Sequence, residues 1–332
     1  MRYCRAIGVA LAFTCASSAF AIDIVLNPGA NLSANPQALQ AFNRAATTWE
    51  SLLSDPITVT VYADIVPMPS STAATNPAMI GFNFDFIRDK MVTDALDEGP
   101  DDAILASMPT YANFTATLPA GSSLNGSMIA TKANLKAIGV NLDDVFGPKD
   151  ADITFNANRP FDYDNSDGIG PGLFSFESAA LHEIGHALGF TSTVELTSGS
   201  TIAPHPLDLF RFQNGAANVD PTEATFGTTP RFLIQGGVPI FDDGVNEWAM
   251  SSQLDGFGAS HWKDDSLTGV YIGLMDPAGP AGTAKYITNA DLRAFDLIGY
   301  EIVTLPEPAS LIALAFGAVG LRRRHMSHLK ST

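Results

Sequence analysis

The chain has 332 residues, of which 46% are hydrophobic and only 16% are charged, and this balance is typical of a globular protein and not of a disordered tail. The length permits one large domain or two modest ones, each with its own core. The formal net charge of -17 argues against nucleic acid as a partner, because phosphate groups would be repelled.

The first 21 residues are typical of a secretory signal peptide. A basic start carries two arginines, an apolar stretch follows, and Ala19–Ala21 offers a small-residue cleavage site. We therefore expect an exported protein whose mature chain begins near Ile22. Cys4 and Cys15 both lie within this segment, so the mature protein is expected to have neither disulfides nor thiol chemistry.

Alternating and helical patterns predict both strands and helices in the first half of the mature chain. A short apolar run at 22–26 indicates an edge strand, and Asn35 with Pro36 opens a helix that has one apolar face. Residues 57–66 alternate as a strand does, whereas 70–77 have the composition of a loop. Segments 82–96 and 130–138 have helical spacing, and 152–156 has the pattern of a strand.

The segment 181–190, LHEIGHALGF, has the residue types and spacing of a metal site with an adjacent general base. His182 and His186 are four residues apart, so on a helix their imidazoles project from one face and can bind one metal ion. Glu183 is placed to take a proton from a water at that ion. Zinc suits imidazole ligands with an open coordination position. The alternative is that a pattern with only three fixed positions arose by chance in a buried helix. Ser175 is a plausible N-cap for the helix that carries the two histidines.

An acidic turn precedes this helix. Asp162, Asp164 and Asp167 lie within the segment 161–172, FDYDNSDGIGPG, and suggest an oxygen-rich turn that can bind Ca²⁺. The spacing does not match an EF-hand loop, so a solvated loop is the alternative.

Beyond the metal-binding helix the pattern becomes irregular. Segment 191–269 is rich in Gly, Pro and Asn, and we expect loops that surround the site and do not form a second sheet. Segment 288–300 returns to an amphipathic helix, with Thr288 and Asp291 as a capping pair.

The C-terminal segment 305–332 combines three features in order. Pro306–Pro308 spells PEP, 309–321 is apolar or weakly polar, and Arg322–Arg324 is basic. Thirteen residues are short for a membrane span, so composition alone predicts a transient membrane association with the basic cluster cytoplasmic. The segment resembles the PEP-CTERM sorting signal of exported bacterial proteins. This resemblance implies that the precursor is held at the inner membrane, that an exosortase removes the tail, and that the protein reaches the cell surface or extracellular matrix.

A hydrolytic zinc site normally has three protein ligands. The local pattern resembles that of the metzincin peptidases, HExxHxxGxxH, because His182, Glu183, His186 and Gly189 match it. Ser192 stands where that family has its third histidine, so the third ligand must come from elsewhere.

Further along the chain, His261 precedes Trp262, and Met275 lies in the sequence GLMDP, which looks like the Met-turn of metzincins. The order of these motifs is similar to that of the leishmanolysin branch, and this resemblance implies that His261 is the third ligand. Asp208 and Glu195 remain carboxylate alternatives. His205, between two prolines, is interpreted as a surface histidine. Met275 is otherwise a core residue at a tight turn.

These observations predict an α+β protein with a metzincin-like catalytic domain at 22–304. It would have a twisted sheet and an active-site helix up to about residue 190, followed by a loop-rich subdomain at 191–304. The expected function is that of a secreted or surface-sorted zinc-dependent endopeptidase that hydrolyses protein or peptide substrates. The alternative is a noncatalytic extracellular matrix protein on a decayed peptidase scaffold. A metal hydrolase acting on other substrates ranks last.

Overall fold

A computed structural model describes residues 21–98, 103–196, 201–215 and 225–303. The predicted signal peptide, except for Ala21, and the predicted sorting tail from residue 305 lie outside the described residues. Within the described part, no helix has both the length and the apolar character that a membrane crossing requires.

The described chain contains helices and strands in mixed order. The α-helices are α1 (Ala30–Ser33), α2 (Pro36–Glu50), α3 (Phe84–Glu98), α4 (Ala103–Ala106), α5 (Lys132–Ala137), α6 (Asp143–Phe146), α7 (Phe176–Leu188), α8 (Thr225–Thr228), α9 (Asp265–Thr268) and α10 (Asn289–Leu297). The strands are β1 (Asp23–Pro28), β2 (Thr58–Val66), β3 (Ala73–Pro77), β4 (Met79–Asn83), β5 (Ala116–Thr117), β6 (Ser123–Leu124), β7 (Ser127–Thr131), β8 (Lys149–Asn156), β9 (Phe161–Asp162), β10 (Phe174–Ser175), β11 (Thr201–Ile202), β12 (Arg211–Gln213), β13 (Arg231–Phe232), β14 (Pro239–Asp242) and β15 (Glu247–Ala249). Short 3-10 helices span Tyr111–Asn113, Asn165–Asp167, Thr193–Leu196 and Pro206–Phe210.

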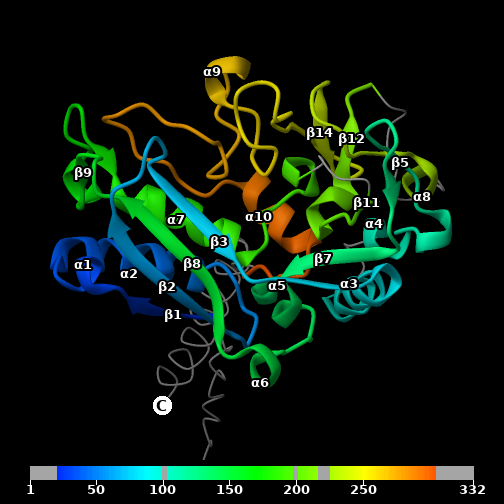
Figure 1. Ribbon diagram of the computed structural model, residues 1–332, viewed down its shortest axis with the longest axis horizontal. Helices are drawn as coiled ribbons and strands as arrows, with labels where there is room; N and C mark the ends of the chain where they lie inside the picture. Colours follow the sequence, from blue (N-terminus) through cyan, green and yellow to red (C-terminus); the bar gives the residue numbers. More distant parts are fainter. Residues whose placement is uncertain (1–20, 99–102, 197–200, 216–224, 304–332) are drawn as a thin grey trace, which may run out of the picture.

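The largest sheet has four strands in the order β1-β2-β8-β3 (Figure 1). The first three strands are parallel, and β3 pairs antiparallel with β8 at the edge of the sheet. The predicted strands at 22–26, 57–66 and 152–156 are therefore confirmed as β1, β2 and β8. These strands could be predicted from the sequence because they contain β-branched and aromatic residues, which are enriched in strands.

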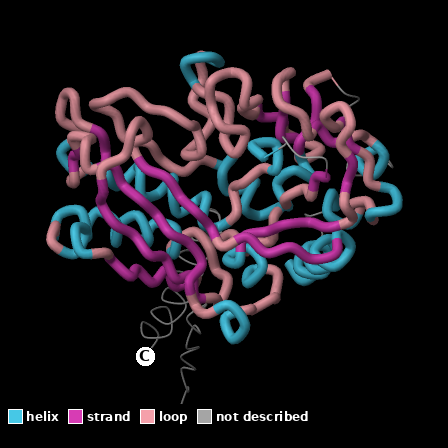
Figure 2. Tube along the Cα trace, in the orientation of Figure 1, coloured by secondary structure: helices cyan, strands magenta, loops and turns pink. Residues whose placement is uncertain are grey.

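Helices α2 and α7 pack against each other behind this sheet (Figures 1 and 2). Asn35 caps α2 as predicted, because its side chain accepts a hydrogen bond from the Ala38 N–H. Trp49 of α2 is fully buried, and its indole N–H donates to the Leu181 carbonyl of α7 at 3.0 Å. Helix α7, which carries His182 and His186, is thus held by α2 as well as by its own contacts with β3 and β8 of the sheet.

The prediction of a loop at 70–77 was wrong for its second part, since β3 spans Ala73–Pro77. This segment has small and polar residues, and its strand conformation comes from pairing with β8. An edge strand needs hydrogen bonds on one side only, so it tolerates Pro77 and a weak pattern. The pairing partner lies about 80 residues away, which local sequence cannot reveal.

The expectation that 191–269 forms no second sheet was also wrong. Strands β12, β14 and β15 form a three-stranded antiparallel sheet, although each has only three or four residues. Strands this short carry too few residues for alternation to be recognised. The rest of the segment consists mainly of loops and short helical turns, and the fold class is α+β, as predicted.

Candidate metal centre

Helix α7 begins and ends at residues that the sequence marks. Ser175 caps its start by accepting a hydrogen bond from the Ser178 N–H, as predicted. Gly189 ends it with φ +132°, a conformation that side chains other than glycine rarely adopt. Between these limits, His182 and His186 lie one turn apart on one face.

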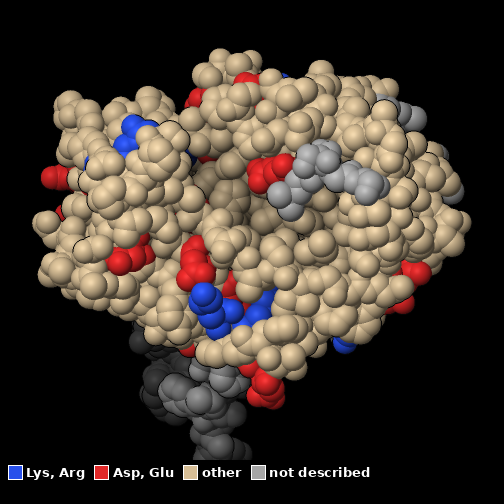
Figure 3. Space-filling model, in the orientation of Figure 1, with Lys and Arg blue, Asp and Glu red and all other residues tan. Residues whose placement is uncertain are grey.

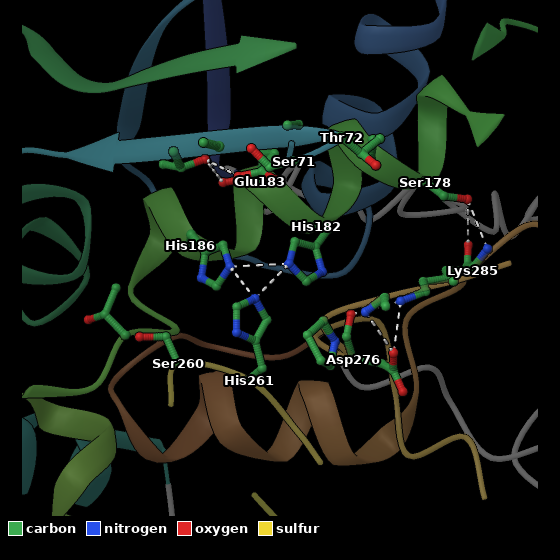
Figure 4. A pocket seen from close by; sticks show the side chains of 18 of the residues that line it. Ser71, Thr72, Ser178, His182, Glu183, His186, Ser260, His261, Asp276 and Lys285 are labelled. Carbon is green, nitrogen blue, oxygen red and sulfur yellow. Dashed lines mark hydrogen bonds and ion pairs between the residues drawn. The ribbon is translucent and has the colours of Figure 1, made fainter. Parts of the chain in front are cut away.

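Three imidazoles point toward one another in front of α7 (Figure 4). The Nε2 atom of His186 lies 3.1 Å from those of His182 and His261, and the latter two are 3.2 Å apart. The structure therefore brings His182, His186 and His261 into one cluster that can hold a metal ion.

The backbone determines which nitrogens carry protons. Each Nδ1 lies 2.8–2.9 Å from a carbonyl oxygen, to which only an N–H can donate: that of Leu274 for His182, Phe190 for His186 and Gly258 for His261. Burial lowers the pKa of His182 well below its usual value and that of His261 to about 3, so both rings are neutral. A ring that donates from Nδ1 can present a lone pair at Nε2, and three converging Nε2 atoms can bind one cation.

His261 reaches the cluster on a loop that is 75 residues from His186 in sequence. Gly258 allows a close approach in this loop, because a Cβ there would lie 2.5 Å from Glu195 Oε1 and 3.2 Å from His261 Nδ1. Glu195 Oε1 accepts a hydrogen bond from the Ser260 N–H at 2.9 Å. The carboxylate that was an alternative third ligand therefore holds the loop that carries His261.

Asp208, the other alternative, also lies outside the cluster. Its carboxylate accepts hydrogen bonds from the Ser192 hydroxyl at 2.6 Å and from the Thr193 N–H at 2.9 Å. The Ser192 N–H in turn donates to the Ser260 hydroxyl at 2.9 Å. Ser192, at the position where metzincins have a histidine, thus helps to anchor the distant loop that brings His261.

The interpretation of His205 as a surface residue was wrong. Its side chain is only 4% exposed, and its Nδ1 lies 3.0 Å from the Thr191 hydroxyl. The flanking prolines do not hold it at the surface, because His205 begins a buried 3-10 helix that Asp208 caps. His205 does not join the metal-ligand cluster.

Met275 packs beneath the cluster. It is fully buried, and a Cβ added at Gly185, between the two helix histidines, would lie 2.5 Å from its sulfur. Gly185 therefore allows this close approach, a role that the sequence did not reveal. Burial of Met275 fits both interpretations made from the sequence, a core residue and the floor of a metal site.

Glu183 lies on the same helix and lines the adjoining cleft. Its Oε2 accepts a hydrogen bond from the Thr75 hydroxyl of β3 at 2.7 Å. Burial raises the pKa of the Glu183 carboxyl above its usual range. A carboxylate with a raised pKa beside a metal site is suited to accept and return a proton.

The three histidines line a cleft of about 830 Å³, and Figure 3 shows a hollow in this face of the molecule. Strand β3 and the preceding residues 71–72 line one wall, and residues 276–280 line another. This volume accommodates an extended segment of a polymer or a sizeable small molecule.

The predicted calcium turn is not supported. Asp162, Asp164 and Asp167 are all described, but their carboxylates do not form a group whose oxygens all lie within 4.8 Å of one another. Asp162 instead accepts hydrogen bonds from the Asp164 and Gly170 N–H groups, and Asp164 caps the following 3-10 helix at Ser166. These carboxylates shape the turn, which is the usual role of aspartate in loops.

Asp291 of α10 connects the parts of the site. Its fully buried carboxylate accepts hydrogen bonds from the Trp262 indole N–H and from the N–H groups of Leu274 and Met275, at 2.7–3.1 Å. Trp262 follows His261, and Leu274 supplies the carbonyl that orients His182. The sequence identified Asp291 as a helix-capping residue but gave no sign of this second role.

We expect Asp291→Asn to lower metal affinity about 10–100-fold, the range found when a partner of a ligand is altered. The amide NH₂ would face donors only, because both carboxylate oxygens of Asp291 accept hydrogen bonds. Competition with a chromophoric chelator measures the affinity. Asp296→Asn, on the same helix but paired with Arg293, is the control, and equal affinity of both variants would contradict the role of Asp291.

Comparisons of the chain with models of protein families, with curated proteins and with solved structures find no match. A functional assignment therefore rests on the geometry of this site and on the motifs of the sequence.

Proposed function

We propose that this protein is an exported zinc-dependent endopeptidase with a metzincin-like catalytic domain. The observation that carries the proposal is the convergence of three imidazoles through their Nε2 atoms. Zinc–nitrogen bonds of about 2.0–2.1 Å at tetrahedral angles require nitrogens about 3.3 Å apart. The separations of 3.1–3.2 Å among His182, His186 and His261 come close to this requirement.

The number of ligands supports a catalytic site over a structural one. A structural zinc normally has four protein ligands, whereas a hydrolytic zinc has three and keeps a position for water or substrate. In the part of the chain that the structure describes, the group comprises three histidines. This arrangement argues against the noncatalytic alternative.

Zinc bound here would supply Lewis-acid chemistry, polarising the scissile carbonyl and acidifying the attacking water. Glu183 would act as the general base toward a water and then return the proton to the leaving amine. Thr75 holds the carboxylate of Glu183 through Oε2, and burial keeps its pKa raised, so that the proton is both accepted and released.

The shape of the cleft favours a polypeptide substrate. Strand β3 is an edge strand of the main sheet, and it lines the cleft beside Glu183. An extended peptide can add to such an edge through main-chain hydrogen bonds, which do not depend on its side chains. The scissile bond would then lie beside β3, the strand whose Thr75 donates a hydrogen bond to Glu183.

Export and surface sorting are part of the proposal. They rest on the N-terminal signal pattern at 1–21 and on the likeness of 305–332 to a PEP-CTERM signal with its exosortase. The second resemblance, to metzincins of the leishmanolysin type, rests on His182, Glu183, His186, Gly189, His261 and Met275.

The test is to purify the chain and measure its zinc content together with cleavage of an unfolded protein such as casein. We expect one zinc per chain, and hydrolysis that a chelator abolishes and added zinc restores. A protein that binds no zinc would refute the site. A protein that binds zinc stoichiometrically and cleaves no polypeptide would refute the proposed function.

A further inference from the structure

A second group of possible metal ligands lies beside the histidine cluster. It comprises Asp264, Asp265 and Asp276, each of which offers a carboxylate oxygen within 4.8 Å of the others. Asp264 and Asp276 are buried, with exposed fractions of 2% and 0%. Burying carboxylates together is costly unless a cation compensates their charge.

Protein groups compensate this charge only in part. Lys285 Nζ lies 3.0 Å from Asp276 Oδ1 and donates to the Asp276 carbonyl at 2.8 Å (Figure 4). Among the described residues, no cationic group forms a salt bridge with Asp264 or Asp265. Three carboxylates against one ammonium leave two negative charges, which one divalent cation would neutralise.

One oxygen of Asp264 lacks a partner. Its Oδ1 accepts hydrogen bonds from the N–H and hydroxyl of Ser266, whereas its buried Oδ2 accepts none from any described residue. Two other buried carboxylate oxygens also lack hydrogen-bond donors, but both lie close to Lys132 Nζ, at 2.6 Å from Asp143 and 3.5 Å from Asp150. A buried anionic oxygen with neither donor nor ammonium is available as a ligand for a cation.

From this combination we infer that Asp264, Asp265 and Asp276 form a calcium site. Calcium binds oxygen ligands at about 2.3–2.6 Å, so ligands on opposite sides of the ion are about 5 Å apart, and the spacing of this group fits within that limit. Magnesium requires a smaller and nearly ideal octahedron and retains several waters. Calcium therefore suits an irregular group of three carboxylates better.

The proposed calcium site lies on the same two segments as His261 and Met275, so an ion bound there would affect the histidine cluster. Asp264 follows His261 by three residues, and Asp276 directly follows Met275. The two segments are already joined by the Trp262 N–H, which donates to the Met275 carbonyl at 3.0 Å. An ion across Asp264 and Asp276 would add a second link, so calcium should slow the loss of zinc. This consequence rests on the proposed zinc site, whereas calcium binding does not.

The experiment uses the purified full chain, freed of divalent metals and then loaded with zinc alone. Titration calorimetry with CaCl₂ should show one site with a Kd on the order of 10⁻⁴–10⁻³ M, as in other extracellular proteins. Calcium at 10 mM should raise Tm by about 5 °C, and MgCl₂ should give less than half of that shift. Absence of calcium binding would overturn the inference, and an equal response to magnesium would overturn the choice of ion.

Two variants and a control locate the site. Asp264→Asn and Asp265→Asn should each weaken calcium binding at least about tenfold and reduce the Tm shift. Asp265 is only partly buried, so its variant tests the site even if Asp264→Asn folds poorly. Asp167→Asn, in the turn where the acidic groups do not converge, should respond as the unaltered protein does. A normal calcium response in Asp265→Asn, or its loss in Asp167→Asn, would contradict the site.

The same measurements separate this inference from the proposed function. If the chain binds calcium but neither zinc nor substrate, the calcium inference stands and the proposed peptidase function is refuted. A zinc-dependent peptidase that binds no calcium would give the opposite result. Zinc release into a chelator, timed with and without calcium, tests the link between the two sites, and equal rates would refute it.

Discussion

Replacing Glu183 with glutamine should lower kcat/KM for peptide hydrolysis by about 10³-fold, within the range attributed to general acid–base catalysis. Glutamine has nearly the same shape and can still accept the Thr75 hydrogen bond, but it cannot take up a proton. Zinc content should stay at one per chain, because Glu183 is not in the ligand cluster. Steady-state kinetics and elemental analysis of the same preparation measure both properties.

Glu177→Gln is the matched control for this experiment. Glu177 lies in the first turn of the same helix, and its carboxylate pairs with Arg44 at 2.7 Å. Loss of such a partly exposed pair costs at most about 1 kcal/mol of folding free energy and removes no proton acceptor from the site. Hydrolysis at the unaltered rate in Glu183→Gln would disprove the proposed mechanism, whatever the zinc content.

Replacing His261 with alanine should weaken zinc binding by more than about 100-fold, the upper range for altering only a partner of a ligand. The change removes one of the three Nε2 atoms and leaves two, which do not complete a zinc site. Hydrolysis should fall with the bound zinc, and excess zinc should restore it only in part. Competition with a chelator gives the affinity, and circular dichroism confirms that the chain remains folded.

His205→Ala provides the comparison. Both histidines are held by loops beyond α7 and line the cleft, but only His261 joins the cluster. We expect the His205 variant to keep its zinc, with a cost limited to stability because a buried side chain is lost. Retention of zinc in His261→Ala together with its loss in His205→Ala would mean that the ligand has been assigned to the wrong residue.

Some tertiary features left only a partial sign in the sequence. The capping pair of Thr288 and Asp291 was recognised, because Asp291 accepts the Thr288 N–H at 2.8 Å within one helical turn. The contacts of the same carboxylate with Trp262 and the Met275 turn are 16 to 29 residues distant in sequence. A carboxylate can accept more hydrogen bonds than a helix cap uses. Tertiary packing decides which other N–H groups donate to its remaining lone pairs.

The acidic residues show why spacing along a loop is a weak guide to a metal site. Asp162, Asp164 and Asp167 are close in sequence, and the spacing suggested a shared ion, yet each carboxylate turns to nearby backbone N–H groups or stays apart. Asp276 is distant from Asp264 in sequence but adjacent in space. Proximity along a loop does not establish convergence, since loops have no period that aligns their side chains.

By itself, the sequence determined the elements whose geometry is periodic: strands β1, β2 and β8, helix α2 with its cap, and the shared face of His182 and His186 on α7. Helix and strand periods follow from local backbone geometry, so residue spacing is sufficient to predict them. Only the tertiary structure decided that β3 is an edge strand beside the cleft, that Thr75 holds Glu183, and that His261 completes the cluster while Asp208 and Glu195 support it. Those relations join residues far apart in the chain, and they depend on which surfaces pack together when the core is buried.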